Sequence, residues 1–247
     1  MSRLCSLLVF PLLSACLPAG AAFAQSKIAH GVPDSTHAAV GTVVFAPNST
    51  CSGVLVDRKW VLTAAHCVEN PTFPPTHFLA GSDYTAPTQT IPVARHVMDP
   101  AYDPDTFDHD FALVRLARST SGLGPMPLLT PANDHLQTGD TLTLVGYGTT
   151  ESGGNTHRRR GQATISQMDA TLLITDGPAQ ACGGDSGGPA LRAVGGVEVV
   201  AGIMSFTYST CDAPGASTET GHGRVSAAYD SFLLPTLLDV VFDDGFE

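Results

Sequence analysis

Short apolar runs separated by turn-forming residues make up most of the chain after residue 28. These runs are rich in Val, Leu, Ile and Thr and are bounded by Gly, Pro, Asn or Asp, which is typical of β-strands. Helical periodicity is sustained only over 226–234, where Pro235 should end the helix. Many strands with almost no helices between them indicate an all-β antiparallel sandwich or barrel. The expected strands are 38–45, 53–56, 60–63, 111–116, 141–145, 161–166, 171–175 and 197–203.

Two segments without strand pattern divide the chain further. Residues 119–134 are rich in Ser, Gly and Pro and lie between two groups of strands, so we interpret them as an interdomain connection. Residues 71–76 are rich in proline and are expected to form a surface insertion.

The first 24 residues have the layout of a secretory signal peptide. Arg3 carries a positive charge, 4–17 are almost wholly apolar, and Ala22-Phe23-Ala24 fits the small-x-small cleavage rule before Gln25. About 14 apolar residues are too few to span a bilayer. Leu13-Ser14-Ala15-Cys16 resembles a bacterial lipobox, so anchoring through a lipidated Cys16 is the lesser alternative. We therefore expect a protein that is secreted, to the extracellular space or the periplasm, with no integral membrane segment after processing.

Export determines how the cysteines are interpreted. Cys5 and Cys16 leave with the signal, and the four remaining thiols in an oxidising compartment predict two disulfides with three possible connectivities. Pairing between sequence neighbours would close loops of about 17 and 30 residues, each worth about 3 kcal/mol in the loop-entropy model. No two cysteines have the spacing of a zinc knuckle. The four are Cys51, Cys67, Cys182 and Cys211.

Composition and charge exclude several classes of protein. Hydrophobic residues are 43% of the chain and charged residues 14%, which argues against disorder. The formal net charge of −11 repels phosphate backbones and anionic lipid, so nucleic acid and membrane surfaces are poor partners. The basic cluster at 157–160 is expected to be a solvated loop, and the acidic tail at 240–247 has no assignment. No segment indicates a cofactor or a metal, and a monomer is the default.

Three segments carry residues that together could hydrolyse an amide. They are TAAHC at 63–67, HDFAL at 109–113 and CGGDSGGP at 182–189. The reaction needs a nucleophile, a base to remove its proton, and a group that holds the base in the right tautomer. Each segment alone has a common structural interpretation, but the order His, Asp, Ser with cysteines beside the first and third is highly specific.

With these motifs the sequence resembles the chymotrypsin–trypsin family of serine proteases, from Ile28 to about Leu234. The resemblance implies two six-stranded antiparallel β-barrels with a short C-terminal helix. It divides the chain into a signal peptide at 1–24, a propeptide at 25–27 and a peptidase domain at 28–247. That domain would comprise a first barrel at 28–125, a second at 126–225, and a C-terminal helix and tail at 226–247.

The resemblance also implies a role for each motif. Ser186 would attack the scissile carbonyl, His66 would be the base and Asp110 would orient it. The N–H groups of Gly184 and Ser186 would form the oxyanion hole. The substrates would be proteins or peptides.

An activation step is implied at the N-terminus. Cleavage after Lys27, by an activating protease, would create an ammonium at Ile28 that pairs with the buried Asp185. The three-residue propeptide is shorter than the family pattern, so latency itself is left open.

The resemblance places Gln180 at the floor of the specificity pocket, where trypsin-like members have Asp. A buried basic side chain without a counter-charge is disfavoured, so basic substrates are not expected. Thr207 replaces a wall glycine and Thr220 lies near the second wall position. Side chains there would shorten the pocket and favour small or medium uncharged residues, while Ser205, Phe206 and Thr207 would pair with the substrate backbone.

Two other classes remain as alternatives. Gly-x-Ser-x-Gly around Ser186, followed by Asp212 and His222, has the residue order of an α/β-hydrolase. The helix that a nucleophile elbow requires is missing, because Gly187-Gly188-Pro189 follows the serine. A non-catalytic homologue is the second alternative, although all three triad positions are intact.

Overall fold

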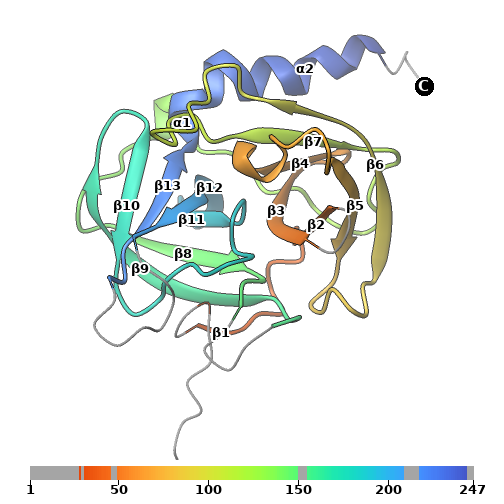
Figure 1. The fold of residues 1–247 in the computed structure, drawn as a ribbon. Coiled ribbons are helices and arrows are strands. Elements are labelled where there is room, and N and C mark those ends of the chain that lie inside the picture. Colours follow the sequence, from red (N-terminus) through yellow and green to blue (C-terminus); the bar gives the residue numbers. More distant parts are fainter. Residues whose placement is uncertain (1–27, 29–30, 46–48, 150–154, 209–216, 244–247) are drawn as a thin grey trace, which may run out of the picture.

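Antiparallel strands dominate the structure, a computed structural model that describes residues 28, 31–45, 49–149, 155–208 and 217–243. The strands close into two six-stranded barrels that lie side by side, as Figure 1 shows. The prediction of two antiparallel β-barrels is confirmed. The segment predicted to connect them, 119–134, runs between the last strand of the first barrel and the first strand of the second.

The first barrel closes in the order β2-β3-β4-β7-β6-β5. Its interior is filled by large side chains with no solvent exposure, including Leu62, Phe78, Ile91 and Leu113. Burial of this apolar area supplies the main stabilisation of the barrel. The strands are β2 (Val40–Phe45), β3 (Ser49–Asp57), β4 (Trp60–Thr63), β5 (Pro75–Ala80), β6 (Gln89–Met98) and β7 (Ala112–Leu116).

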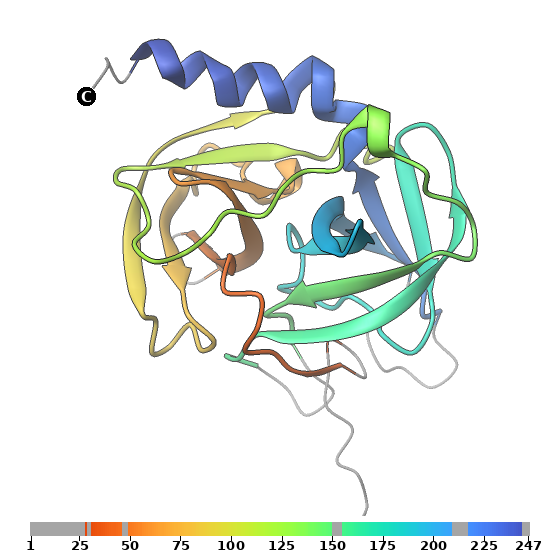
Figure 2. The ribbon, with the colours of Figure 1, turned by 180° about the vertical axis from the view of Figure 1, so that it is seen from behind.

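The second barrel closes because β9 pairs with both β8 and β10. Its core includes Leu142, Leu144, Ile165 and Leu173. The short strand β1 (Val32–Pro33) precedes the first barrel in sequence but pairs with β9, so the N-terminal segment spans both barrels (Figure 2). The barrel strands are β8 (Thr141–Gly146), β9 (Arg159–Met168), β10 (Leu172–Asp176), β11 (Pro189–Val194), β12 (Val197–Thr207) and β13 (Thr220–Arg224).

The C-terminal helix is longer than its sequence predicts. It comprises α1 (Val225–Ala228), a π-helical turn over Tyr229–Leu233, and α2 (Leu234–Asp243). The prediction that Pro235 ends the helix is therefore wrong. Proline is tolerated in the first turn of a helix, and the wider π turn before α2 places Pro235 in such a turn. Among the described residues, no helix is long and apolar enough to cross a bilayer.

The predicted surface insertion at 71–76 is partly wrong, because Pro75 and Thr76 begin strand β5 and Pro75 is buried. Two short 3₁₀ helices, η1 (Ala65–Cys67) and η2 (Pro131–Asn133), complete the regular structure of the described chain.

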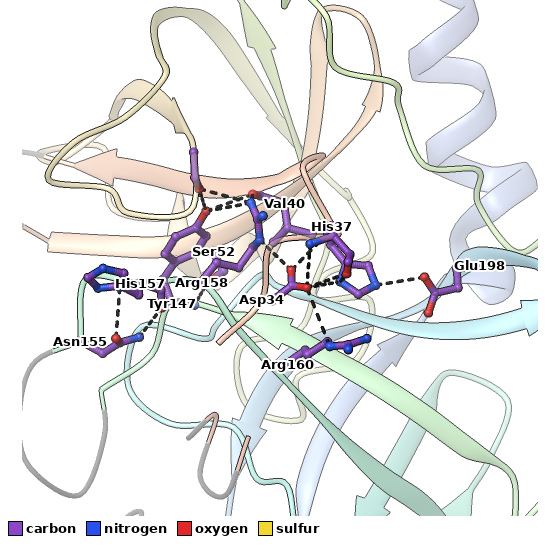
Figure 3. A network of polar contacts seen from close by, with 12 residues as sticks. Asp34, His37, Val40, Ser52, Tyr147, Asn155, His157, Arg158, Arg160 and Glu198 are labelled. Atoms are coloured by element: carbon purple, nitrogen blue, oxygen red, sulfur yellow. Dashed lines mark hydrogen bonds and ion pairs between the residues drawn. The ribbon is translucent and has the colours of Figure 1, made fainter. Parts of the chain in front are cut away.

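The prediction that the basic cluster at 157–160 is a solvated loop is partly wrong: His157 and Arg160 are exposed, but the two arginines between them are buried. Arg158 and Arg159 are 3% and 8% exposed, at the start of β9. Figure 3 shows Arg158 between the two barrels, where Nε donates to Asp34 Oδ2 at 2.8 Å and Nη1 donates to Val40 O at 3.0 Å. A run of charged residues does not have to be exposed, because carboxylate and carbonyl groups from distant segments can accept hydrogen bonds from buried arginines.

The same network holds a histidine between two carboxylates. His37 Nδ1 lies 3.0 Å from Asp34 Oδ1, and Nε2 lies 3.0 Å from Glu198 Oε2 (Figure 3). Burial lowers the pKa of His37, but the two carboxylates outweigh it and raise the pKa overall. The network therefore fastens the segment before β2 to the second barrel by charge as well as by β1 pairing.

The disulfide Cys51–Cys67 is present and confirms one of the two predicted local pairings. Cys182 is also in disulfide form, but its predicted partner Cys211 lies outside the described residues. The signal peptide, Cys16 and Lys27 lie outside them too.

Candidate active site

His66 and Asp110 meet because of strand pairing in the first barrel. His66 lies in η1, three residues after the end of β4, and Asp110 lies two residues before the start of β7. Strands β4 and β7 are antiparallel with Thr63 opposite Ala112, so the end of one strand meets the start of the other. The disulfide from Cys67 to Cys51 on β3 further restrains η1.

Asp110 holds the imidazole of His66 in one orientation. The carboxylate is fully buried, and it accepts His66 N–H at 2.9 Å through Oδ1 and Nδ1 at 2.7 Å through Oδ2. Ser205 Oγ also donates to Oδ2. Because an ionised carboxylate only accepts hydrogen bonds, the proton of neutral His66 resides on Nδ1. Nε2 is then left with a lone pair, as a general base requires.

The loop before Asp110 is strained and covers one side of His66. Phe107 and His109 have φ of 61° and 53°, in the left-handed region that side chains disfavour. The ring of Phe107 packs edge-on against His66, with centroids 6.2 Å apart, and lies 5.3 Å from the ring of Phe206. Strain of this kind clusters at functional sites. Neither residue is a glycine, so this strain could not be expected from the sequence.

Asp185, beside the predicted nucleophile, is a fully buried acid. Its Oδ1 accepts Gly148 N–H at 2.7 Å and its Oδ2 accepts Cys182 N–H at 2.9 Å. Burial raises the pKa of Asp185 to about 7, despite these hydrogen bonds and the nearby charge of Arg159. In the uncleaved chain this carboxyl therefore lacks full compensation for its lost hydration.

The turn around Asp185 leaves two N–H groups without an acceptor among the described residues. Gly184 has φ of +98°, a conformation that favours glycine. Asp185 N–H donates to Cys182 O at 2.9 Å, whereas no described residue accepts from the N–H of Gly184 or of Ser186. Two N–H groups without an acceptor in one turn are the kind of donors that a developing negative charge requires.

Ser186 is connected to the His66–Asp110 pair through Ser205. It lines a pocket of about 120 Å³, and the neighbouring lining residue Ser205 donates to Asp110 Oδ2. In the part of the chain that the structure describes, no hydrogen bond joins Ser186 to His66. Such bonds are often long in unliganded sites and tighten when substrate binds. The other lining residues are Ala181, Cys182, Gly183, Met204, Phe206 and Thr207.

Two of the predicted pocket residues, Gln180 and Thr220, are buried and do not line this pocket. Gln180 is 3% exposed and its Nε2 donates to Ser217 O at 2.8 Å. Thr220 has no exposure, and its Oγ1 accepts Ala181 N–H at 3.1 Å. The lining residues Ala181, Gly183 and Met204 were missed, although each adjoins a predicted site residue.

The α/β-hydrolase alternative is wrong. His222 lies on β13 of the second barrel, is fully buried, and places Nε2 2.8 Å from Thr175 Oγ1. Burial lowers the pKa of His222 to about 3. Asp212 lies outside the described residues.

One group of possible metal ligands occurs among the described residues. It comprises Cys51, His66 and Cys67, whose ligand atoms lie within 4.8 Å of one another. The two sulfurs are joined in the disulfide, and a metal is bound by thiolate. This group is therefore a restraint on His66 rather than a metal site.

The two-barrel fold can be compared with known proteins through its sequence. The sequence model of the family described as Trypsin matches residues 28–223. Trypsin-1 of Astacus astacus is 30% identical over 67% of this chain and 79% of its own length. Chymotrypsin-like elastase family member 1 of Bos taurus is 31% identical over 65% of this chain and 69% of its own length. Trypsin of Phaedon cochleariae is 29% identical over 70% of this chain and 76% of its own length.

The chain belongs to the trypsin family. It is a serine endopeptidase, a hydrolase that acts on protein or peptide substrates. The predicted family and enzyme class are confirmed.

Proposed function

We propose that the chain is a secreted endopeptidase whose catalytic residues are Ser186, His66 and Asp110. The observation that carries this proposal is the 2.7 Å bond between His66 Nδ1 and Asp110 Oδ2, with Ser205 linking that carboxylate to the pocket of Ser186. Secretion is supported by the signal-like residues 1–24 and by the disulfide Cys51–Cys67, since disulfides persist in oxidising compartments.

The mechanism follows from these positions. Ser186 Oγ attacks the carbonyl carbon of the scissile peptide bond while His66 Nε2 accepts its proton. The imidazolium that forms is stabilised by the buried Asp110 carboxylate. His66 then protonates the leaving amine, and water hydrolyses the acyl-enzyme with His66 again acting as base. The N–H groups of Gly184 and Ser186 bind the oxyanion of each tetrahedral intermediate.

We also propose activation by cleavage after Lys27. The side chain of Ile28 is 1% exposed and packs in the core of the second barrel, which holds the future N-terminus inside the protein. The buried Asp185 would gain an ammonium partner, which favours its ionised form. That pair would stabilise the turn that contains Gly184 and Ser186.

The specificity we propose is for small or medium uncharged residues on the acyl side of the cut bond. Thr207 lines a pocket of about 120 Å³, and the family resemblance places Gln180, an amide, where a basic substrate would need a carboxylate. We expect peptide substrates with Ala or Val at that position to be cleaved faster than those with Phe or Arg. Measured kcat/KM values for the four substrates test this, and fastest cleavage after Arg contradicts it.

The catalytic assignment is tested by covalent labelling. A sulfonyl fluoride should modify Ser186 of the processed enzyme and abolish its peptidase activity, because only an activated serine attacks the reagent. Peptide mapping locates the label, and Ser186→Ala should be both unlabelled and inactive. Ser166→Ala is the matched control, because Ser166 Oγ donates to Ile174 O in the second barrel and the label should still be found on Ser186. Activity retained in Ser186→Ala contradicts the proposal.

A further inference from the structure

The turn at 183–186 contains the N–H groups of Gly184 and Ser186, and hydrogen bonds to its carbonyl groups hold it in place. Thr149 N–H donates to Gly183 O at 2.8 Å, and Gly188 N–H donates to Asp185 O at 2.8 Å. With these carbonyls fixed, the N–H groups of Gly184 and Ser186, which share their peptide planes, have fixed directions.

The two remaining carbonyls of this turn are both held by one residue, Ser52. Its N–H donates to Ser186 O at 2.8 Å, and its Oγ donates to Gly184 O at 2.9 Å. Ser52 is fully buried on β3 of the first barrel, beside the disulfide-bonded Cys51. It therefore connects the barrel that carries His66 to the turn that carries Ser186. Among the four carbonyl bonds, the bond to Gly184 O is the one made by a side chain.

The surroundings of Ser52 fix the direction of its hydroxyl proton. Tyr147 N–H donates to Ser52 Oγ at 3.0 Å, which occupies an acceptor position of the hydroxyl. The hydroxyl proton is then available to Gly184 O. The peptide between Gly184 and Asp185 is consequently held at both ends, because Asp185 N–H donates to Cys182 O at 2.9 Å. This peptide lies between the two that carry the N–H groups without an acceptor.

We propose that Ser52 is a positioning residue. Its hydroxyl holds the turn at 183–186 so that the N–H groups of Gly184 and Ser186 point toward the oxyanion that forms at the catalytic centre. The inference rests on the proposed function of that centre. Ser52 does not touch the substrate. Its effect should appear in the transition state and not in substrate binding, because the oxyanion that the two amides bind forms only as Ser186 attacks.

The test compares two substitutions of the same shape, Ser52→Thr and Ser52→Val, which differ in the hydroxyl alone. Removal of an oxyanion donor typically lowers kcat by about 10²–10³-fold, so its displacement should lower kcat by roughly 10–100-fold in Ser52→Val relative to Ser52→Thr. KM for a small peptide substrate should change by less than about threefold, because ground-state binding does not use the oxyanion site. Ser52→Ala should resemble Ser52→Val.

A second readout separates positioning from general loss of structure. A peptide boronic acid forms a tetrahedral adduct with the nucleophile, so its inhibition constant should rise by the factor by which kcat/KM falls. The constant for a non-reactive peptide of the same sequence should be unchanged. Ser166→Ala is the control, because Ser166 Oγ also donates to a backbone carbonyl, Ile174 O, but in the second barrel away from the turn; its kcat should be unaffected.

The inference and the proposed function fail in different ways. Equal kcat in Ser52→Thr and Ser52→Val, with Ser186→Ala inactive, overturns the role of Ser52 and leaves the catalytic assignment intact. An equal loss of boronate and peptide binding in Ser52→Val also overturns it, since a collapsed pocket would then explain the result. An active Ser186→Ala overturns the catalytic assignment itself.

Discussion

Replacing Asp110 by asparagine should lower kcat by roughly 10⁴-fold at neutral pH while leaving the protein folded. Asp110 Oδ2 now accepts from His66 Nδ1 at 2.7 Å, which keeps the proton on Nδ1 and the lone pair on Nε2. Oδ1 accepts His66 N–H at 2.9 Å, a bond that the amide oxygen of asparagine can retain. The amide nitrogen would then face Nδ1, donate to it, and move the imidazole proton to Nε2. A histidine in that tautomer cannot accept the proton of Ser186.

Active-site titration and single-turnover kinetics measure this loss, and Asp99→Asn is the matched control. Asp99 is also buried and also bonds a histidine, with Oδ2 3.0 Å from His109 Nδ1, yet it does not contact His66. We expect Asp99→Asn to keep kcat within about tenfold of the wild type. Asp110→Asn with more than a tenth of wild-type kcat would show that Asp110 does not set the tautomer of His66.

Much of the fold could be predicted from the sequence because buried strands carry their own apolar side chains. Strand β4 is buried at all four positions, and its apolar run is visible in the sequence. Strand β13 was missed because aromatic side chains of other segments fill the space beside its glycines. A Cβ at Gly221 would overlap the ring of Phe206, and one at Gly223 would overlap the ring of Phe111. A strand whose neighbours supply the side chains leaves no hydrophobic pattern of its own.

The candidate site residues were likewise predictable only where the signal lies in the local sequence. His66, Asp110 and Ser186 stand in recognisable local motifs, so the sequence indicated them. Ser52 was missed, and Arg158 was wrongly expected to be solvated, because their partners are far away in sequence. Ser52 bonds Gly184 across 132 positions, and Arg158 bonds Asp34 across 124. Only the three-dimensional arrangement shows why either is buried.

Replacing Arg158 by methionine should lower the free energy of unfolding by about 3–5 kcal/mol, the usual cost of breaking a buried ion pair by removing one partner. Arg158 is 3% exposed, and its guanidinium bonds Asp34 Oδ2 at 2.8 Å, Val40 O at 3.0 Å and Gly81 O at 3.2 Å. Methionine would fill much of the space but leave a buried carboxylate and two carbonyls without this donor. Denaturant unfolding in the Ser186→Ala background, which prevents autolysis, measures the change.

Arg192→Met is the control for loss of an arginine in general. Arg192 Nη2 lies 3.0 Å from Asp140 Oδ1, but its side chain is 33% exposed, so the loss should stay within about 1 kcal/mol. Similar small decreases in the unfolding free energy of both variants would show that the buried bonds of Arg158 do not stabilise the fold more than a surface ion pair does. A double-mutant cycle with Asp34→Asn should give a coupling energy of about 1–3 kcal/mol, because both side chains belong to one network.

The effect of Arg158→Met should also depend on pH in a defined direction. Burial raises the pKa of Asp34, but hydrogen bonds from His37, Thr36 and Arg158 outweigh it and hold the pKa well below its usual range. A carboxyl whose pKa is depressed by folding contributes stability that is full above its unfolded pKa, about 4, and declines as the pH falls below it. Because the unfolded chains of wild type and Arg158→Met titrate alike, the pH dependence of the difference in their unfolding free energies comes from the folded proteins, in which loss of Arg158 raises the pKa of Asp34. The difference should therefore shrink as the pH falls through the pKa of Asp34 in folded Arg158→Met. A difference that grew on acidification would show that the carboxylate of Asp34 is not what Arg158 stabilises.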